Sequence, residues 1–375
     1  TTTLTGAVTL PAGTTSDTLS FRNLIINGAM QVAQRGTSST ATNINTVDRW
    51  YGSHSGTNEA PTQAQHDLTS SDTGPWEKGF RKSFHITNGN QTGGAGAGDY
   101  INMQTRLEAQ NFANSGWDYT STSSYITLSF WVKSSVAQNF YGYLKTIDGT
   151  TQGYPFETGS LSANTWTKIT KTIPGNSNIT IDNNNGQGFQ LNISPFWGTN
   201  HTDSGVSLNT WAAYATGTRT PDSTSTWYTT NDSTFEITGV QLEVGSTATE
   251  FEHRSYADEL SRCQRYTWKV YADEGVDDIL ATGIARDTGQ SRYVFQHPVE
   301  MRANPSITIS GSTKAYDGSG WNAFTNSQVV KLYSNKNRFT IYAESSDTNH
   351  TSGKACWIQQ SGSASTAYFL ASAEL

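Results

Sequence analysis

The sequence predicts an all-β protein, a jelly-roll β-sandwich followed by a short helix and a smaller C-terminal β domain. Charged residues make up only 15% of the 375-residue chain, against about 25% in ordinary globular chains. Aromatic residues reach 11% and there are 34 glycines, a composition typical of short strands joined by turns and unlike that of disordered chains. Apolar and polar residues also alternate in several short runs, as they do in strands with one buried face.

The clearest strand pattern in the sequence runs from Ile126 to Val132. Every second residue from Ile126 to Val132 is apolar, whereas Thr127 and Ser129 between them are polar. This alternation predicts a half-buried antiparallel strand. The same pattern recurs over residues 189–193.

A second pattern predicts an irregularity in the last strand of the sandwich. Phe235 and Ile237 begin an alternation that resumes one residue out of step at Val240. The slip falls at Thr238-Gly239, and a glycine where the alternation loses its period predicts a β-bulge.

The chain is predicted to divide into four parts. We expect an extended arm or fibre-shaft end at residues 1–20, the sandwich at 21–253, a linking helix at 254–268 and a C-terminal β domain at 269–375. The arm is rich in threonine and only weakly apolar, so a floppy tail is an equal alternative.

The linking helix is predicted from its first residues. Ser255 is a good helix-capping residue, and Asp258 and Glu259 place negative charge in the first turn, where the helix dipole favours it. An apolar face at helical spacing consists of Tyr256, Leu260, Cys263 and Tyr266.

Charge and hydropathy exclude several partners. The net charge is 24 − 31 = −7 and no basic stripe is visible, so we expect no nucleic-acid partner and no attraction to anionic membranes. No run approaches the roughly 18 apolar residues of a membrane span, which predicts no membrane insertion. Residues 1–4 lack the basic and apolar regions of a signal peptide. A neutral partner such as a glycan suits this composition better.

The sequence offers no catalytic, metal or cofactor motif. The acidic pairs Asp277-Asp278 and Asp258-Glu259 are neighbours in sequence, whereas glycan hydrolysis needs two carboxylates facing each other across a cleft. The glycine-rich run at 92–98 lacks the Lys-Ser/Thr of a phosphate loop. The histidines show no metal-binding spacing, and His66-Asp67 is expected to be a solvated turn. We therefore predict no enzyme activity, no catalytic residues, no cofactor and no bound metal.

The two cysteines, Cys263 and Cys356, adjoin no histidine or further cysteine. This arrangement excludes an ordinary zinc site. Both lie beside aromatic residues, which favours two reduced, buried thiols, although a disulfide between them stays open.

Aromatic residues in polar, turn-rich segments are the candidate binding residues. Sugars stack their apolar faces on exposed rings while amides and carboxylates bind the hydroxyls. The candidate glycan-binding residues are Trp117, Trp197, Trp227, Tyr228 and Trp321. The alternative is that these rings pack against the edge of the sandwich or a neighbouring subunit.

Several segments together resemble a module of bacteriophage tail-fibre and related virion proteins, over about residues 20–270. They are Asn23–Gln31, Gln34–Gly36, Val47–Tyr51, Arg106–Ala109, Leu128–Lys133, Gly239–Gly245, Phe251–Tyr256 and Leu260–Tyr266. Pro298–Pro305 and Ala373–Leu375 also look like the usual ending of such phage proteins. The resemblance implies a homotrimer that lies in the virion and contacts other virion proteins.

The same scaffold is similar to jelly-roll carbohydrate-binding modules, which often hold a structural calcium ion. The corresponding positions here are Gln31 and Thr238-Gly239, where the family's acids are missing, so no calcium is expected. Glu236 and Glu243 are alternative calcium ligands, but ordinary surface carboxylates on a strand are the favoured interpretation.

The favoured function is therefore a non-enzymatic virion fibre or spike protein, made in the host cytoplasm, that recognises a host-surface polysaccharide or receptor. One rival is an architectural virion component without a ligand, such as a head decoration, head fibre or tail part. The other rival is a glycan-degrading enzyme, which would require carboxylates facing each other across a groove.

Overall fold

The computed structural model describes residues 22–43, 46–273, 278–361 and 366–375. The chain divides into two compact units, one ending at Ser255 and grouped with Leu375, the other spanning Tyr256–Glu374. The arm predicted at residues 1–20 lies outside the described residues. Within the described residues, no helix is long and apolar enough to cross a membrane.

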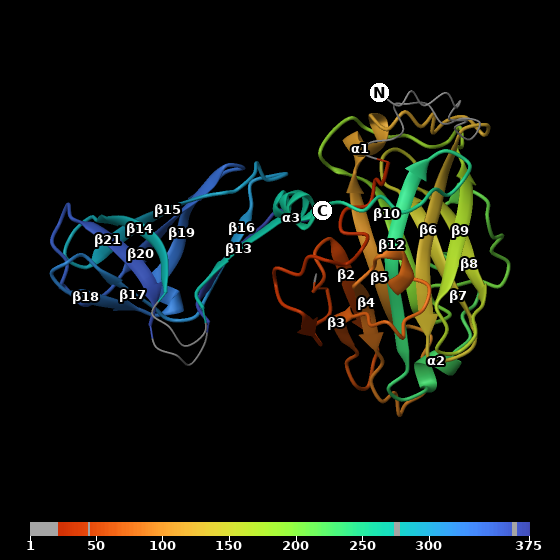
Figure 1. The fold of residues 1–375 in the computed structure, drawn as a ribbon, viewed down its shortest axis with the longest axis horizontal. Helices are drawn as coiled ribbons and strands as arrows, with labels where there is room; N and C mark the ends of the chain where they lie inside the picture. The colour runs from red at the N-terminus through yellow and green to blue at the C-terminus, as the bar shows by residue number, and fades with distance from the viewer. Residues whose placement is uncertain (1–21, 44–45, 274–277, 362–365) are drawn as a thin grey trace, which may run out of the picture. The chain divides into compact units, whose positions relative to one another are not determined.

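The first unit is an antiparallel sandwich of two six-stranded sheets (Figure 1). The β12 sheet consists, in spatial order, of β1 (Ser38–Ser39), β3 (Thr62–Asp67), β4 (Lys82–Thr87), β12 (Thr234–Val244), β6 (Tyr125–Ser134) and β9 (Thr167–Pro174). The β10 sheet consists of β11 (Ala212–Ala213), β8 (Gln152–Ser160), β7 (Asn139–Thr146), β10 (Gln187–Trp197), β5 (Tyr100–Glu108) and β2 (Trp50–Ser55). The chain crosses repeatedly from one sheet to the other, as in jelly rolls. The predicted all-β class is confirmed.

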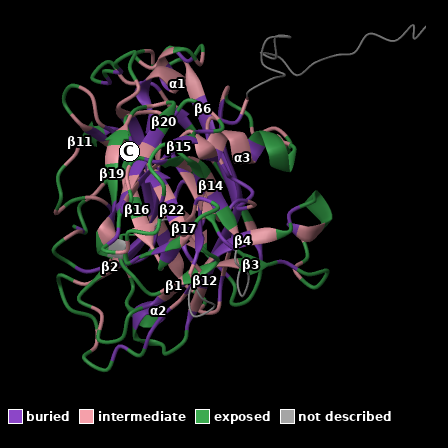
Figure 2. Ribbon diagram, turned by 90° about the vertical axis from the view of Figure 1, so that its left-hand side faces the viewer, coloured by how far each residue is buried: buried purple, intermediate pink, exposed green. Residues whose placement is uncertain are grey.

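Strand β6 shows how the sequence pattern produces the core. Ile126 and Phe130 are fully buried between the sheets, whereas Trp131 and Lys133 on the opposite face are only partly covered. Burial follows the strands and exposure follows the loops (Figure 2). The apolar residues of the predicted alternation do face the core, but the strand is more than half buried, because Thr127 and Ser129 on the opposite face are only 0% and 3% exposed.

The predicted bulge in β12 is also confirmed. The register between β12 and β6 shifts between Thr238 and Gln241. Gly239 has a φ of 61°, and a Cβ atom there would lie 2.6 Å from the ring of Phe80. Glycine is required at this position because it tolerates the left-handed conformation and leaves room for that ring.

Short helices close the ends and edges of the sandwich. They are η2 (Trp76–Lys78), α1 (Ala109–Ala113) and α2 (Thr226–Thr229). Helix α2 buries Trp227 and Tyr228 completely.

The second unit begins with helix α3 (Tyr256–Gln264), which carries Asp258 and Glu259 in its first turn as predicted. A three-stranded sheet follows the order β13 (Thr267–Tyr271), β22 (Tyr368–Ser372) and β16 (Ser306–Ser310). A seven-stranded sheet follows the order β18 (Trp321–Phe324), β17 (Thr313–Tyr316), β21 (Ala355–Gln360), β14 (Ile279–Ala285), β15 (Gln290–Gln296), β20 (Arg338–Glu344) and β19 (Val329–Ser334), with η3 (Asn326–Gln328) before β19. Cys263 and Cys356 are both buried thiols that form no disulfide, as predicted.

Candidate functional site

The structure buries four of the five rings predicted to bind glycan. Trp117, Trp197, Trp227 and Tyr228 are at most 5% exposed, whereas Trp321 is 41% exposed. A buried ring has no free face for a sugar. The four are therefore withdrawn as candidate binding residues of the single chain, and Trp321 is kept.

The four rings are buried by their packing. Trp197 ends strand β10, Trp227 and Tyr228 lie on helix α2, and only Trp117 lies in a loop. The indole of Trp227 donates a hydrogen bond of 2.9 Å to the carbonyl oxygen of Thr234. The ring of Tyr228 stacks on Phe196 with the centroids 4.4 Å apart. Trp117 and Trp197 likewise pack against other rings. These contacts match the packing alternative stated for the predicted residues.

Trp321 belongs to a cluster of three rings on the seven-stranded sheet. On β17, Tyr316 pairs directly with Trp321 on one side and with Trp357 of β21 on the other. The Tyr316 ring centroid lies 4.7 Å from that of Trp321 and 5.0 Å from that of Trp357. We call Tyr316, Trp321 and Trp357 the ring triad. Cross-strand pairing fixes the three rings on one face of the sheet.

Polar groups surround the ring triad. The Lys314 ammonium lies 4.8 Å from the centroid of the Trp321 ring. The indole of Trp357 donates to the side-chain oxygen of Gln359 over 2.8 Å. Gln359 is only 5% exposed, so the partly exposed rings provide the apolar contact that a sugar uses and the Lys314 ammonium provides a hydrogen-bond donor.

Sequence reasoning missed two members of the ring triad. Tyr316 and Trp321 flank the turn sequence Asp-Gly-Ser-Gly, a hairpin signal from which their pairing was accessible. Trp357 lies 36 residues beyond Trp321 in the chain, and nothing in its local sequence indicates that β21 lies next to β17.

A second group of polar residues lies on the outer face of the β12 sheet. Glu236 is only 2% exposed. Its carboxylate accepts a hydrogen bond of 2.7 Å from the Ser83 hydroxyl and lies 3.0 Å from the Lys133 ammonium. Nδ1 of His66 lies 3.2 Å away and Nδ1 of His85 lies 3.4 Å away. We call these five residues, together with Asp72, the Glu236 cluster.

Two expectations are corrected here. Glu236 and Glu243 are not surface carboxylates, because both are buried, and Glu243 accepts hydrogen bonds from Thr249 and Gln241. His66 is not part of a solvated turn, since it lies on β3 and contacts Glu236.

The Glu236 cluster brings together three possible metal ligands. The ligand atoms of His66, His85 and Glu236 all lie within 4.8 Å of one another. However, the Lys133 ammonium lies 3.0 Å from Glu236 and 2.8 Å from Asp72, so a protein cation already occupies the position beside both carboxylates. The arrangement is that of a buried charge network rather than of an open metal site.

The same network is unsuited to general acid catalysis. Burial raises the pKa of Glu236, but its contacts with His66, His85 and Lys133 outweigh burial and hold the pKa well below its usual range. Burial also opposes ionisation of Asp72, yet hydrogen bonds led by that from Lys133 lower its pKa to about 2. A glycosidase acid needs a raised pKa, and both carboxylates here are held ionised.

We expect the stability of the first unit to fall in two separate pH ranges. The hydrogen bond to Glu236 raises the pKa of His66 above its usual 6.5, so this stabilising contribution is complete below pH 6.5 and is lost as the pH rises through the raised value. The pKa of Asp72 is lowered from 3.8 to about 2, so its contribution is complete above pH 3.8 and is lost as the pH falls toward 2. Thermal unfolding measured from pH 2 to 9 checks both ranges.

The variants His66→Gln and Asp72→Asn serve as paired controls for this pH dependence. His66→Gln should flatten the alkaline decline and leave the acid decline in place, and Asp72→Asn should do the opposite. A wild-type alkaline decline that persists unchanged in His66→Gln would contradict the assignment.

The residues that correspond to a family calcium site form other contacts. The hydroxyl of Thr238 donates to the carbonyl oxygen of Lys82. Near the opening segment, the Glu252 carboxylate accepts the backbone N–H of Asn23 over 2.9 Å and pairs with Arg254 at 2.9 Å. This carboxylate is already neutralised by a guanidinium group, so nothing in these residues favours a calcium ion.

Comparison with known proteins yields structural similarity only. No family model and no curated protein matches the chain. The enzymatically active domain of tailspike protein 4 of bacteriophage CBA120 aligns with 60% of this chain and 21% of its own length, at 12% identity and a TM-score of 0.32. This chain thus spans about one fifth of that tailspike structure.

Carbohydrate-binding modules are further structural neighbours. A putative sugar-binding protein from Bacteroides thetaiotaomicron aligns over 60% of this chain and 100% of its own, at 13% identity and a TM-score of 0.31. The N-terminal cellulose-binding domain of Cellulomonas fimi β-1,4-glucanase C aligns over 58% and 99%, at 8% identity and a TM-score of 0.28. These values assign no role to any residue of the present chain.

Proposed function

We propose that this chain is a non-enzymatic glycan-binding protein of a bacteriophage particle and that the ring triad is its binding surface. The observation that supports this function is the cross-strand cluster of Tyr316, Trp321 and Trp357, with ring centroids 4.7 and 5.0 Å apart on one sheet face. An aromatic surface bordered by the Lys314 ammonium suits the apolar face and hydroxyls of a sugar.

The virion location rests on the tail-fibre-like segments of the sequence. A fibre or spike would present several copies of this chain, and a homotrimer is part of the proposal. A single exposed ring triad binds sugar weakly, and linked copies would raise the overall affinity without any new contact. Host-surface polysaccharide is therefore the expected ligand.

Trp321→Ala is expected to weaken glycan binding by about 5- to 12-fold, since one stacking ring contributes roughly 1–1.5 kcal/mol. Trp357→Ala should act in the same direction. The measurement is a glycan array with the whole chain, followed by titration of the best ligand.

Tyr333→Ala is the matched control, because Tyr333 is a 71% exposed ring of the same unit outside the ring triad. It should bind like the wild type. Absence of any glycan ligand, or an equal loss in Tyr333→Ala, would contradict the assignment.

An architectural role is the second candidate, favoured by apolar side chains on the same sheet. Ile284, Val294 and Val330 are each between 46% and 49% exposed. Cross-strand pairs link Ile284 to Arg292, Arg292 to Tyr342 and Tyr342 to Val330. Exposed apolar patches of this kind mark protein–protein contact surfaces.

If this face joins subunits, Val330→Lys should dissociate the assembly, because a charge would be buried without a partner. Sedimentation velocity of the whole chain measures the change in mass. Lys331→Glu, one residue further along β19 and also exposed, is the control for a change of charge alone. A wild-type chain that sediments as a monomer at all concentrations would reject the interface.

A further inference from the structure

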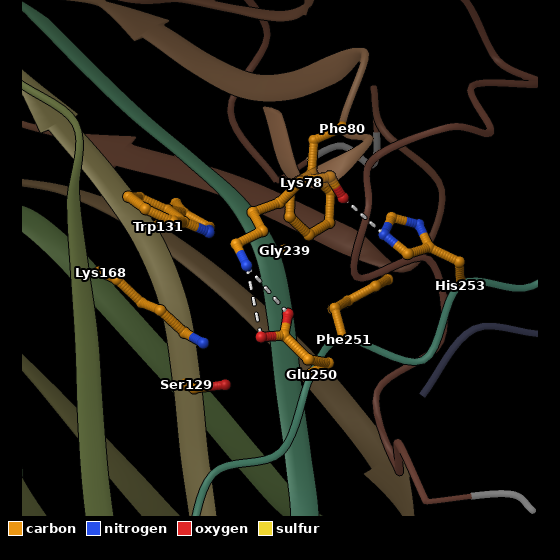
Figure 3. A pocket seen from close by; sticks show the side chains of 9 residues that line it. All are labelled: Lys78, Phe80, Ser129, Trp131, Lys168, Gly239, Glu250, Phe251 and His253. Atoms are coloured by element: carbon orange, nitrogen blue, oxygen red, sulfur yellow. Dashed lines mark hydrogen bonds and ion pairs between the residues drawn. The ribbon is translucent and has the colours of Figure 1, made fainter. Parts of the chain in front are cut away.

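The outer face of the β12 sheet contains a small pocket beside the bulge (Figure 3). Trp131 of β6 and Lys168 of β9, which pair directly across the two strands, lie on one side of it. Glu250 and Phe251, just beyond β12, lie on the other side. The pocket has a volume of about 110 Å³.

Its aromatic walls are held in fixed positions. Phe80 and Phe251 pack edge to face with centroids 4.8 Å apart. Gly74 lies against the Trp131 indole so closely that a Cβ atom there would come within 2.7 Å of the ring. The bulge at Gly239 provides the space that Phe80 occupies. Because these contacts exist before any ligand arrives, little ordering cost is expected on binding.

The charges around the pocket leave one positive group unmatched. The Lys78 ammonium pairs with the Glu250 carboxylate at 3.3 Å. Lys168 is exposed, and no carboxylate in the described part of the chain forms an ion pair with it. Figure 3 shows the amino groups of Lys78 and Lys168 both directed toward the space between the walls. Two ammonium groups and one carboxylate give this rim a net charge of +1, in a chain whose net charge is −7.

We propose that this pocket binds the carboxylate-bearing edge of an acidic sugar residue, such as a uronate, with Lys168 receiving the carboxylate and Trp131 and Phe251 covering the apolar ring face. Cavities of roughly 150 Å³ take up one benzene ring, so the smaller pocket here fits one edge of a single sugar ring. The pocket is too small to hold several consecutive sugar residues of a polysaccharide. Charge-assisted hydrogen bonds to the ammonium give the site its preference for an acid.

The site is separate from the ring triad, which lies in the other unit. Failure of one proposal therefore leaves the other intact, and Trp321→Ala should not change binding at this pocket. The two sites are also expected to bind different ligands, since the ring triad does not need an acidic sugar.

Calorimetric titration of the whole chain with glucuronate, glucose and acetate tests the proposal. Glucuronate is expected to bind with a dissociation constant in the millimolar range, and glucose and acetate at least tenfold more weakly. Lys168→Gln should weaken glucuronate binding by about tenfold, and it should remain folded because the residue is exposed.

Lys171→Gln is the matched control, because it removes the same charge from the same strand at a position outside the pocket lining. It should bind glucuronate like the wild type. The proposal is overturned if glucuronate gives no saturable heat, if acetate or glucose binds equally well, or if the two lysine variants lose the same affinity.

Discussion

Replacing Lys133 with alanine is expected to lower the free energy of unfolding of the first unit by about 3–5 kcal/mol, the cost of breaking a buried ion pair by removing one partner. The ammonium lies 3.0 Å from Glu236 and 2.8 Å from Asp72, and both carboxylate side chains are at most 13% exposed. Removing it leaves two negative charges close together on a largely covered sheet face. Urea denaturation followed by tryptophan fluorescence measures the loss as a shift in the transition of that unit.

Two further variants make this result specific. Lys168→Ala removes an exposed lysine from the adjacent strand and should change stability by no more than about 0.5 kcal/mol. Adding Glu236→Gln to Lys133→Ala should recover part of the loss, because a neutral amide leaves less buried charge unmatched. A loss below about 1 kcal/mol in Lys133→Ala would show that solvent reaches these carboxylates and that the network is not buried.

The parts of the fold that the sequence predicts are those determined by local pattern. The alternation from Ile126 to Val132 needs only neighbouring residues to define a buried face. The bulge at Gly239 can be predicted because a glycine stands where the alternation of apolar and polar residues slips by one residue. Helix α3 is predicted from a cap and a charged first turn. Each of these signals lies within about ten residues of chain.

The candidate sites depend on strand order, which local pattern does not contain. Glu236 contacts His66, although 170 residues of chain separate them. The contact forms because β3, which carries His66, and β12, which carries Glu236, both flank β4 in the same sheet. From the sequence alone, Glu236 is expected to be a surface group, because it faces away from the core. Side chains from the neighbouring strands and from the segment around Asp72 bury it in the structure. Trp357 joins Tyr316 for the same reason, through the adjacency of β17 and β21.

The burial of the loop aromatics has a different physical origin. Trp227 and Tyr228 lie in a polar segment between strands, which suggested exposure. The segment forms helix α2 and turns both rings into the end of the sandwich. Large rings at the end of a sandwich cover core residues that the sheets leave open, and a polar flanking sequence does not indicate which way a ring points.

Trp227→Ala is therefore expected to destabilise the first unit by about 3–5 kcal/mol, as large core truncations do. Trp227 is fully buried, packs edge-on against Phe235 at 6.4 Å and donates its indole hydrogen to Thr234. Alanine would leave a cavity next to Phe235. It would also remove one of the two hydrogen bonds that the Thr234 carbonyl oxygen accepts, the other coming from the backbone N–H of Ser135. Thermal and urea unfolding measure the effect.

Alanine at Trp321 should instead have little effect on stability and a large effect on glycan affinity. Trp321 is 41% exposed, so Trp321→Ala is expected to change stability by no more than about 0.5 kcal/mol while it weakens glycan binding. Trp227→Ala should lower stability and, in the fraction that stays folded, leave glycan affinity unchanged. A stable Trp227→Ala protein that has lost glycan binding would return this ring to the binding surface. That outcome would require α2 to open when a sugar binds, because the closed arrangement gives a sugar no access to the indole.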